Sequence, residues 1–488
     1  MSSRLRLLIA CLATSVVLAP LIWMWSNSLM PDDYSVMDMG YADYGGGAAA
    51  TAAGGHAGLH AGGMDITEIV ADADRPADVK VHLVAEQGEF TLASGRTVSG
   101  YTLNGQSPGP EIRAVQGQLV EVTLENRSVP DGITLHWHGV DVPNAMDGVA
   151  GVTQDAVPKG GSYTYRFVAE QAGTYWYHSH QVSHEQVKGG LLGALVVMPE
   201  EQDPGLVDAL ALVHVYDGRH TVNGRERELA VPAPPGATVR VRAINTDNGV
   251  MSVWTSGAPY RLVAVDGNDV HDPGQVEDKA VLLTAGARAD LEVVMPADGS
   301  GVRVEMGGTA VALGEPTPPT SKPERLLDLL DYGSPAPIGF DPADATRSFD
   351  YVIGRRPGFV DGRPGLWWTI NGHLFPDVPM FTVTEGDIVR MHIENNSGDE
   401  HPMHLHGHHV VVLARDGVRA TGSPWWTDSL NVADGGAYDV AFLADNPGVW
   451  MDHCHNLPHA AEGLVAHLMY TGFRTPFTIG GTADNTPE

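Results

Sequence analysis

The sequence predicts an all-β protein with three β-sandwich domains of one kind, preceded by a single membrane-spanning helix. Three observations carry this prediction. Glycine and proline are abundant, at 58 and 33 of 488 residues, which suits domains with many turns. A short strand pattern recurs three times at domain-sized spacing, which indicates repeated copies of one unit. An uncharged apolar run lies near the N-terminus.

The apolar run extends from Leu7 to Trp25 and follows Arg4 and Arg6. It is long enough to cross a bilayer as a helix, and the arginines are expected to stay in the cytoplasm. A cleaved signal peptide is the alternative, but no clear small-x-small cleavage site follows the run. We therefore expect residues 1–25 to anchor the chain in a cell membrane, with the domains on the extracytoplasmic side.

Residues 26–78 are expected to form a flexible tether, because their first part is rich in glycine, alanine, methionine and histidine. Thioethers and imidazoles suit weak binding of a soft ion such as Cu(I), although a plain low-complexity linker is the simpler interpretation. The side chains concerned are Met30, Met37, Met39, His56, His60 and Met64.

The repeated unit joins an Asn-Gly turn to a strand. Each copy places Asn-Gly after a short apolar run, then a glycine, an alternating strand, and an asparagine nine residues after that glycine. The alternating stretches are 117–126, 236–245 and 386–395. Alternation with period two predicts half-buried strands, and three recurrences predict three copies of one sandwich.

The domain boundaries follow from turn residues and proline. We expect domain one at 79–200, domain two at 201–314 and domain three at 346–488. The proline-rich linker at 315–345 carries a short apolar, helix-like piece at 326–330.

The net charge argues against a nucleic-acid partner, and the positions of the cysteines argue against a disulfide. The net charge of −31 argues against a nucleic-acid partner, because phosphates need a basic surface. The two cysteines are Cys11, in the apolar run, and Cys454, in a histidine cluster, so a disulfide between them is improbable.

Paired histidines occur in the first and third repeats but not in the second. A His-x-His pair on a strand puts both imidazoles on one face. Eight imidazoles that share an apolar interior have polar nitrogens that something must bind, so we expect a metal cluster between domains one and three. The pairs are His136/His138, His178/His180, His404/His406 and His453/His455.

Cys454 narrows the choice of metal. It lies between two of these histidines, and His459 follows five residues on. With His401 these side chains make a set of two histidines and one thiolate, as in blue copper sites. The position ten residues after the cysteine, where an axial ligand is usual, is Leu464, and leucine cannot bind a metal.

The motifs together resemble those of the multicopper oxidases over nearly all of residues 80 to 475. They are His136-Trp-His-Gly, Tyr177-His-Ser-His, His401-Pro-Met-His-Leu-His and His453-Cys-His with His459. The resemblance implies cupredoxin-like Greek-key domains and four copper ions: one type 1, one type 2 and two type 3.

The resemblance also assigns ligands. His401, Cys454 and His459 match the type 1 ligands, and His136 and His404 those of type 2. His138, His178 and His455 match one type 3 copper, and His180, His406 and His453 the other.

The family reaction couples four one-electron oxidations to the reduction of oxygen to water, which consumes protons. Asp147 matches an acid used for this purpose, although it also suits a turn before glycine. Many relatives carry a second glutamate, at positions that are Ala460 or Leu457 here, while Glu462 is out of register.

The expected activity is that of a laccase-like oxidase acting on phenols or aromatic amines, in a catalytic unit that needs no second chain. The alternatives are a metallo-oxidase for Cu(I) or Fe(II), and a non-catalytic copper-binding envelope protein. A copper nitrite reductase is disfavoured because it needs fewer histidines. The reductant itself, a small molecule or a metal ion, is left open by the sequence.

Overall fold

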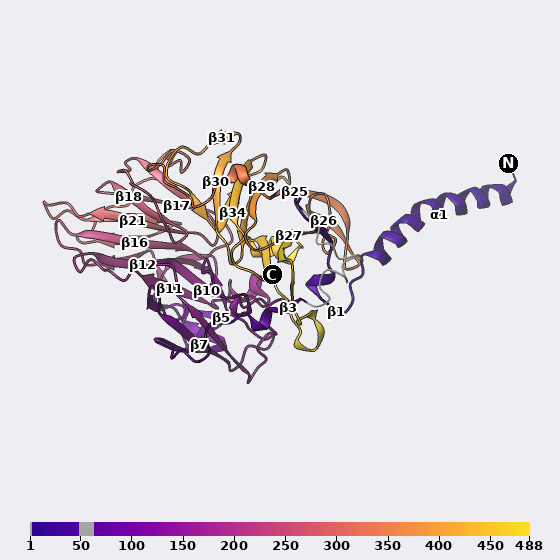
Figure 1. The fold of residues 1–488 in the computed structure, drawn as a ribbon, viewed down its shortest axis with the longest axis horizontal. Coiled ribbons are helices and arrows are strands. Elements are labelled where there is room, and N and C mark those ends of the chain that lie inside the picture. Colours follow the sequence, from indigo (N-terminus) through magenta and orange to yellow (C-terminus); the bar gives the residue numbers. More distant parts are fainter. Residues whose placement is uncertain (1, 48–62) are drawn as a thin grey trace.

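The computed structural model describes residues 2–47 and 63–488, and its body consists of three β-sandwiches (Figure 1). The predicted all-β, cupredoxin-like class is confirmed. The first sandwich pairs two four-stranded sheets. One has the order β5 (Thr97–Leu103), β4 (Val79–Thr91), β7 (Leu119–Asn126), β9 (Ser162–Val168), and the other β6 (Ile112–Val115), β11 (Leu192–Met198), β10 (Gly173–His178), β8 (His136–His138).

The second sandwich has a seven-stranded and a six-stranded sheet. The first runs β14 (Arg225–Glu226), β13 (Arg219–Val222), β12 (Val207–Tyr216), β16 (Thr238–Asn245), β21 (Arg288–Val294), β18 (Tyr260–Val265), β19 (Asn268–Asp269). The second runs β15 (Glu228–Val231), β23 (Thr309–Leu313), β22 (Val302–Met306), β17 (Met251–Ser256), β20 (Lys279–Leu283), β24 (Arg325–Leu326). The expected helix-like piece at 326–330 is wrong: the segment pairs as β24 and then turns.

All four paired histidines of the C-terminal half lie in the third sandwich or directly after its strands. One sheet has the order β2 (Tyr41–Asp43), β27 (Pro379–Val383), β36 (Val465–Tyr470), β35 (Val449–Cys454), β29 (His401–Leu405), β33 (Ser429–Val432). The other has β26 (Arg363–Ile370), β25 (Arg347–Val360), β28 (Ile388–Asn395), β34 (Ala437–Leu443), β30 (Val410–Arg415), β31 (Val418–Arg419), and β32 (Trp426–Thr427) pairs with β30. Short helices α3 (Ser183–Gln186) and α4 (Leu457–Ala461) lie in loops.

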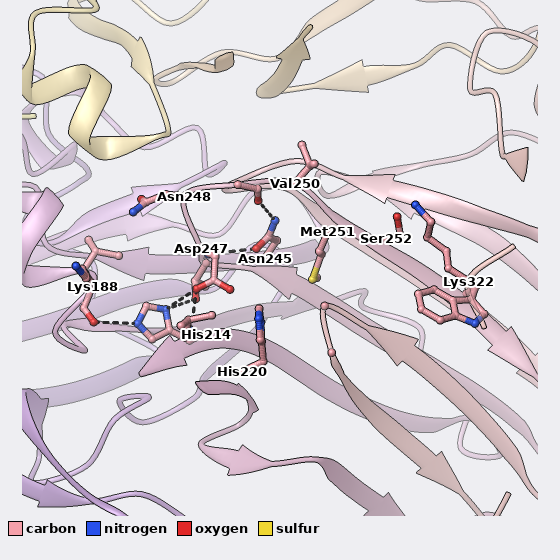
Figure 2. Close-up of a pocket in the computed structure, with 17 residues that line it drawn as sticks. Lys188, His214, His220, Asn245, Asp247, Asn248, Val250, Met251, Ser252 and Lys322 are labelled. Atoms are coloured by element: carbon pink, nitrogen blue, oxygen red, sulfur yellow. Dashed lines mark hydrogen bonds and ion pairs between the residues drawn. The ribbon is translucent and has the colours of Figure 1, made fainter. Parts of the chain in front are cut away.

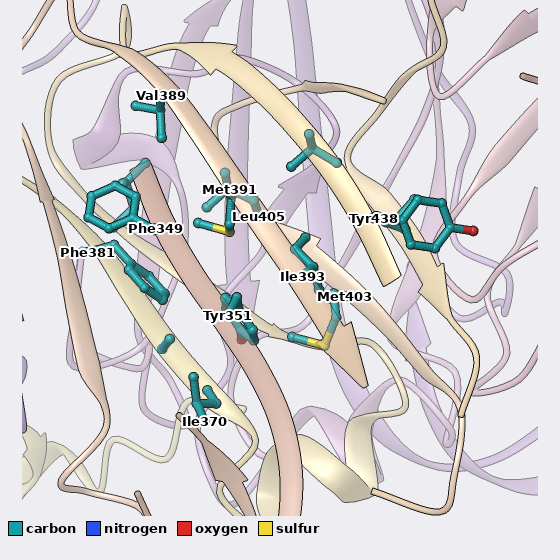
Figure 3. Packing of buried hydrophobic residues seen from close by; sticks show 14 of the residues in the cluster. Phe349, Tyr351, Ile370, Phe381, Val389, Met391, Ile393, Met403, Leu405 and Tyr438 are labelled. Carbon is teal, nitrogen blue, oxygen red and sulfur yellow. The ribbon is translucent and has the colours of Figure 1, made fainter. Parts of the chain in front are cut away.

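The core of the third sandwich lies between its sheets. Figure 3 shows Tyr351 and Met391 from one sheet facing Phe381 and Leu405 from the other. These side chains are buried, because alternate residues of each strand point inward. The packing fixes the strands β29 and β35, which carry candidate ligands at their ends.

The repeated Asn-Gly turns have one geometry. Asn104, Asn223 and Asn371 all have positive φ, and each is followed by a glycine that also has positive φ. Their side-chain oxygens accept backbone N–H groups at 2.6–2.9 Å. Asparagine and glycine tolerate this left-handed backbone, which explains why the same pair recurs.

The asparagines that end the repeated strands are also alike. Asn126, Asn245 and Asn395 are fully buried, and each donates its amide to a backbone carbonyl of the loop that follows its strand. A buried amide must be paired, so these residues tie loop to strand in every sandwich.

The segment after the N-terminal helix differs from the expected free tether. β1 (Asp33–Tyr34) pairs with β38 (Ile479–Gly480), β2 joins the edge of the third sandwich, and β3 (Met64–Asp65) pairs with β37 (Phe473–Arg474). Val36, Met37 and Met39 are buried in a cluster with Met451 and Met469. These apolar side chains stabilise the docked segment by leaving water. His56 and His60 lie outside the described residues.

The helix α1 (Ser3–Asn27) projects away from the body, and all of its residues are exposed (Figure 1). It is the one helix among the described residues that is long and apolar enough to cross a membrane. A membrane anchor and a signal sequence both fit this finding.

Candidate metal centre

The structure brings the eight paired histidines together where the first and third sandwiches meet. β8 and β10 carry His136, His138 and His178 from the first, and β29 and β35 lead to His404 and His453 from the third. Nε2 of His136 lies 3.3 Å from Nε2 of His404, and the same distance separates the Nε2 atoms of His180 and His453. His-x-His alternation puts both members of a pair on the same face, which explains the convergence.

Three groups of nitrogen atoms form within the cluster, with the ligand atoms of each group inside 4.8 Å of one another. The groups are His136, His138, His404; His138, His178, His455; and His180, His406, His453. All eight side chains are buried. The second and third groups contain the same residues as the two expected type 3 sets, whereas the first group adds His138 to the expected type 2 pair, His136 and His404.

These imidazoles fit a metal cluster better than they fit an ordinary core. Burial first, and then mutual repulsion, lowers the pKa of most of them well below the usual value, so they are neutral and offer lone pairs. Nε2 of His178, Nδ1 of His180 and both nitrogens of His455 have no hydrogen-bond partner within the described chain. Unpaired buried nitrogens are costly unless something binds them, and imidazole is a ligand that copper accepts.

The second candidate centre lies at the end of β35. Sγ of Cys454 is 3.5 Å from Nδ1 of His401 and 3.8 Å from Nδ1 of His459. Burial raises the pKa of the Cys454 thiol, so a cation is needed to hold it as thiolate. Leu464 is buried in the same apolar cluster, and its carbonyl accepts the N–H of Cys454 at 3.1 Å.

Asp147 lies against the cluster. Its two carboxylate oxygens are 3.1 Å from Nδ1 of His136 and 3.0 Å from Nδ1 of His406. The following Gly148 has positive φ, and a Cβ there would sit 1.8 Å from the carbonyl oxygen of Leu135. Glycine therefore lets the loop approach β8 closely enough to bring Asp147 to the imidazoles.

Asp428 is a residue of the site that the sequence did not reveal. It is buried, lies 3.2 Å from Nε2 of His138, and its backbone carbonyl is 2.8 Å from Nδ1 of His404. Arg288, from the second sandwich, donates two hydrogen bonds of 2.7 and 2.6 Å to the Asp428 carboxylate. Burial acts to raise the pKa of Asp428, but Arg288 and the neighbouring histidines hold it well below the usual value.

The histidines outside the pairs are mostly satisfied. His214 contacts Thr246 and the Lys188 carbonyl, and His408 contacts the Tyr470 hydroxyl at 2.6 Å. His409 forms ion pairs with Asp141 and Asp428. Asp428 also contacts His138, so a single side chain connects His409 to the cluster. Glu462 accepts the indole N–H of Trp368 at 2.8 Å, and the Trp368 ring lies 4.6 Å from the His459 ring.

A surface cavity of about 630 Å³ lies beside α4 on the second sandwich (Figure 2). His220, Asp247, Asn248, Met251 and Trp254 are among its lining residues. The side-chain oxygen of Asn248 accepts the N–H of Leu457 at 3.4 Å, two residues before His459. The cavity therefore borders the segment that carries His459.

Comparison with known proteins agrees with this geometry. Two family models described as multicopper oxidase match residues 85–202 and 350–472. The chain is 27% identical over 479 residues to laccase-1 of Botryotinia fuckeliana, covering 81% of this chain and 82% of that one. It is 28% identical over 461 residues to the iron transport multicopper oxidase fetC of Epichloe festucae, covering 75% and 72%.

A solved structure supports the same relationship. The crystal structure of a multi-copper oxidase from Pseudomonas thermotolerans superposes with a TM-score of 0.67 at 28% identity, covering 81% of this chain and all of that one. Fold, buried histidine groups and matched segments lead to one conclusion: the chain belongs to the multicopper oxidase family.

Proposed function

We propose that this copper oxidoreductase is laccase-like: it takes single electrons from phenols or aromatic amines and reduces oxygen to water. The observation that carries the proposal is the buried pair of centres, eight imidazoles in one and Cys454 with two imidazoles in the other. Copper bound there would supply reversible one-electron exchange and a place for oxygen to be reduced.

The ligand assignment is part of this proposal. His401, Cys454 and His459 would hold the type 1 ion, and His136 and His404 the type 2 ion. The groups His138, His178, His455 and His180, His406, His453 would hold the type 3 pair. The distances within the groups support the type 1 and type 3 sets, and they also place His136 and His404 together, with His138 beside them.

The main chain links the two centres directly. Cys454 belongs to one, while its neighbours His453 and His455 belong to the other. A single peptide unit joins Cys454 to each of these histidines, which is the shortest covalent link that the chain offers between the two centres. The antiparallel pairing of β35 with β29 holds this link rigid, with Met403 opposite Cys454 and His404 opposite His453.

Asp147 is proposed as the acid that serves oxygen reduction. Its carboxylate contacts imidazoles from both sandwiches, His136 and His406, inside the water-poor interface. This position lets it orient both rings and pass protons to groups bound between them.

Organic reductants are proposed because of the surface around His459. The ring is half-buried, lies 4.6 Å from the Trp368 ring, and its Nε2 is 3.2 Å from the Asn456 amide. The adjoining cavity carries Trp254 together with hydrogen-bonding groups, which suits a flat aromatic molecule with a hydroxyl or amine.

A metallo-oxidase is the second candidate, and one observation favours it. Asp399 and Glu462 are near enough to His459 to act on its charge, and carboxylates attract metal cations. The similarity to an iron transport multicopper oxidase is consistent with this alternative.

Oxygen uptake by the full copper-loaded chain in detergent tests the proposal. The donors are a phenol, an aromatic diamine, Fe(II) and Cu(I), and the Cys454→Ser protein is the control. We expect uptake with the organic donors and none from the control. Uptake confined to the metal ions would replace the laccase-like function with the metallo-oxidase function.

We also propose that α1 anchors the protein, with the body on the extracytoplasmic side. The arginines before the apolar run and the exposure of the whole helix support this arrangement. Protease added to intact cells should cleave the body while the chain stays in the membrane fraction after alkaline washing. Recovery of a soluble chain that lacks residues 3–27 would show a cleaved signal instead.

A further inference from the structure

A second cavity, of about 590 Å³, opens beside the C-terminal end of α1. Met30 and Asp361 line its outer part, and the buried side chains Met451 and His467 line its depth. It lies outside both centres described above, since none of its lining residues is one of their ligands.

His467 is unusual among the buried histidines that lie outside the four pairs. It is 1% exposed, and neither ring nitrogen has a hydrogen-bond partner among the residues that the structure describes. His214 and His408, equally buried, both find partners. A buried imidazole with two unpaired nitrogens costs free energy, so His467, which lines the cavity, points to a ligand.

The neighbours of His467 are methionines. Its strand β36 lies between β27 and β35, and the registers place Met380 and Met451 directly opposite it, one on each side. Met380, Met451, Val465 and Met469 share one apolar cluster, while Leu468 and Tyr470 belong to the cluster on the other face. By alternation His467 is on the methionine face, where side chains on adjacent strands stand about 5 Å apart.

We propose that Met380, His467 and Met451 form a binding site for Cu(I), reached through this cavity. Two thioethers and one imidazole are a soft, uncharged set, which suits Cu(I) better than Zn²⁺, Fe²⁺ or Ca²⁺. Burial lowers the pKa of His467 to about 4, so the ring is unprotonated and free to bind at neutral pH.

The mouth of the cavity favours a cation. The exposed Asp361 and Glu462 line it, against Arg363, while Glu488 is buried and paired with His184. Carboxylates at the rim raise the local concentration of cations. Met30 adds a thioether beside them, so an incoming Cu(I) meets soft and acidic groups in turn.

An anaerobic titration with a chromogenic Cu(I) chelator as competitor tests the site, using the full copper-loaded chain in detergent. We expect the wild-type protein to hold one equivalent of Cu(I) more than Met380→Leu or Met451→Leu, with affinity at that site falling at least tenfold. Leucine preserves volume and removes the thioether. Met391→Leu is the matched control, because Met391 is buried in the cluster on the other face.

The titration of the Cu(I) site does not depend on the oxidase activity. Blue absorption and phenol-driven oxygen uptake report whether each variant folds, while the chelator reports the extra equivalent. Met451 is on the same strand as His453, so its replacement could disturb that histidine. Met380 is on a strand farther from the paired histidines, so the Met380→Leu protein provides the deciding measurement in that case. The proposed site would be overturned if the Met380→Leu protein bound as much Cu(I) as the wild-type protein. It would also be overturned if Met391→Leu lost as much Cu(I) as Met380→Leu, even if phenol oxidation is intact.

Discussion

At the scale of single residues, the site depends on buried carboxylates that hold imidazoles in place. Asp147 contacts two rings from different sandwiches, and Asp428 contacts two others while Arg288 neutralises it. The side chain of each of these two residues is 1% exposed, so its interactions are little screened by water.

Replacing Asp147 by asparagine should separate the two half-reactions. The amide keeps the shape but cannot pass protons, so oxygen consumption with a phenol should fall about 10²-fold or more. Anaerobic bleaching of the blue absorption by the same phenol should be unchanged, because His459 is untouched. Stopped-flow absorbance and an oxygen electrode measure the two steps. Asp217→Asn, in an exposed turn, is the control, and equal loss in both steps would contradict the role.

Arg288→Met should destabilise the protein strongly. It leaves Asp428 and Asp266 buried without their cation, which typically costs about 3–5 kcal/mol. The half-buried pair of Arg240 with Glu292, at 2.8 Å, provides the comparison, and Arg240→Met should cost about 1 kcal/mol or less. Denaturant unfolding of the two proteins measures the difference. Similar midpoints would show that Arg288 stabilises the protein no more than Arg240 does.

The sequence predicted the paired histidines but not the carboxylates that support them. His136/His138 and its counterparts repeat at matching positions, so spacing alone predicted their faces. Asp428 and Arg288 come from different sandwiches, 140 positions apart, and no spacing marks such a pair. His467 gave no signal either, because its methionine neighbours are adjacent only through strand pairing.

At the scale of elements, the N-terminal segment is part of the third sandwich. β1 and β2 are two and three residues long, too short for a periodic pattern, and they pair with strands more than 300 positions away. This is why the sequence predicted a tether there. The repeated strands β7, β16 and β28 were predictable because each is eight residues long and alternates.

Two truncations should therefore behave differently. Removing residues 2–27 takes away only exposed side chains and should leave the thermal midpoint unchanged. Removing residues 2–47 also exposes the cluster around Val36, Met37 and Met39, at about 1.5–3 kcal/mol for each buried side chain. Calorimetry of the two proteins checks this. Equal midpoints would mean that the segment is not docked in solution.

At the scale of the whole molecule, one chain completes the metal centre. The first and third sandwiches supply the imidazoles, and the second supplies Arg288 and the cavity beside α4. Within the described chain, the second sandwich carries none of the grouped side chains, but Arg288 from this sandwich holds Asp428 beside them. Loss of any sandwich would leave the eight-histidine cluster incomplete or unsupported.

Copper content tests the central claim most directly. Metal analysis and electron paramagnetic resonance of the purified full chain, washed with a Cu(I) chelator, should find four copper ions for each wild-type protein. The Cys454→Ser protein should hold three, lack blue absorption and consume no oxygen with any donor, because the eight imidazoles remain while the thiolate is lost. Blue absorption or donor oxidation that persists in the Cys454→Ser protein would contradict the account.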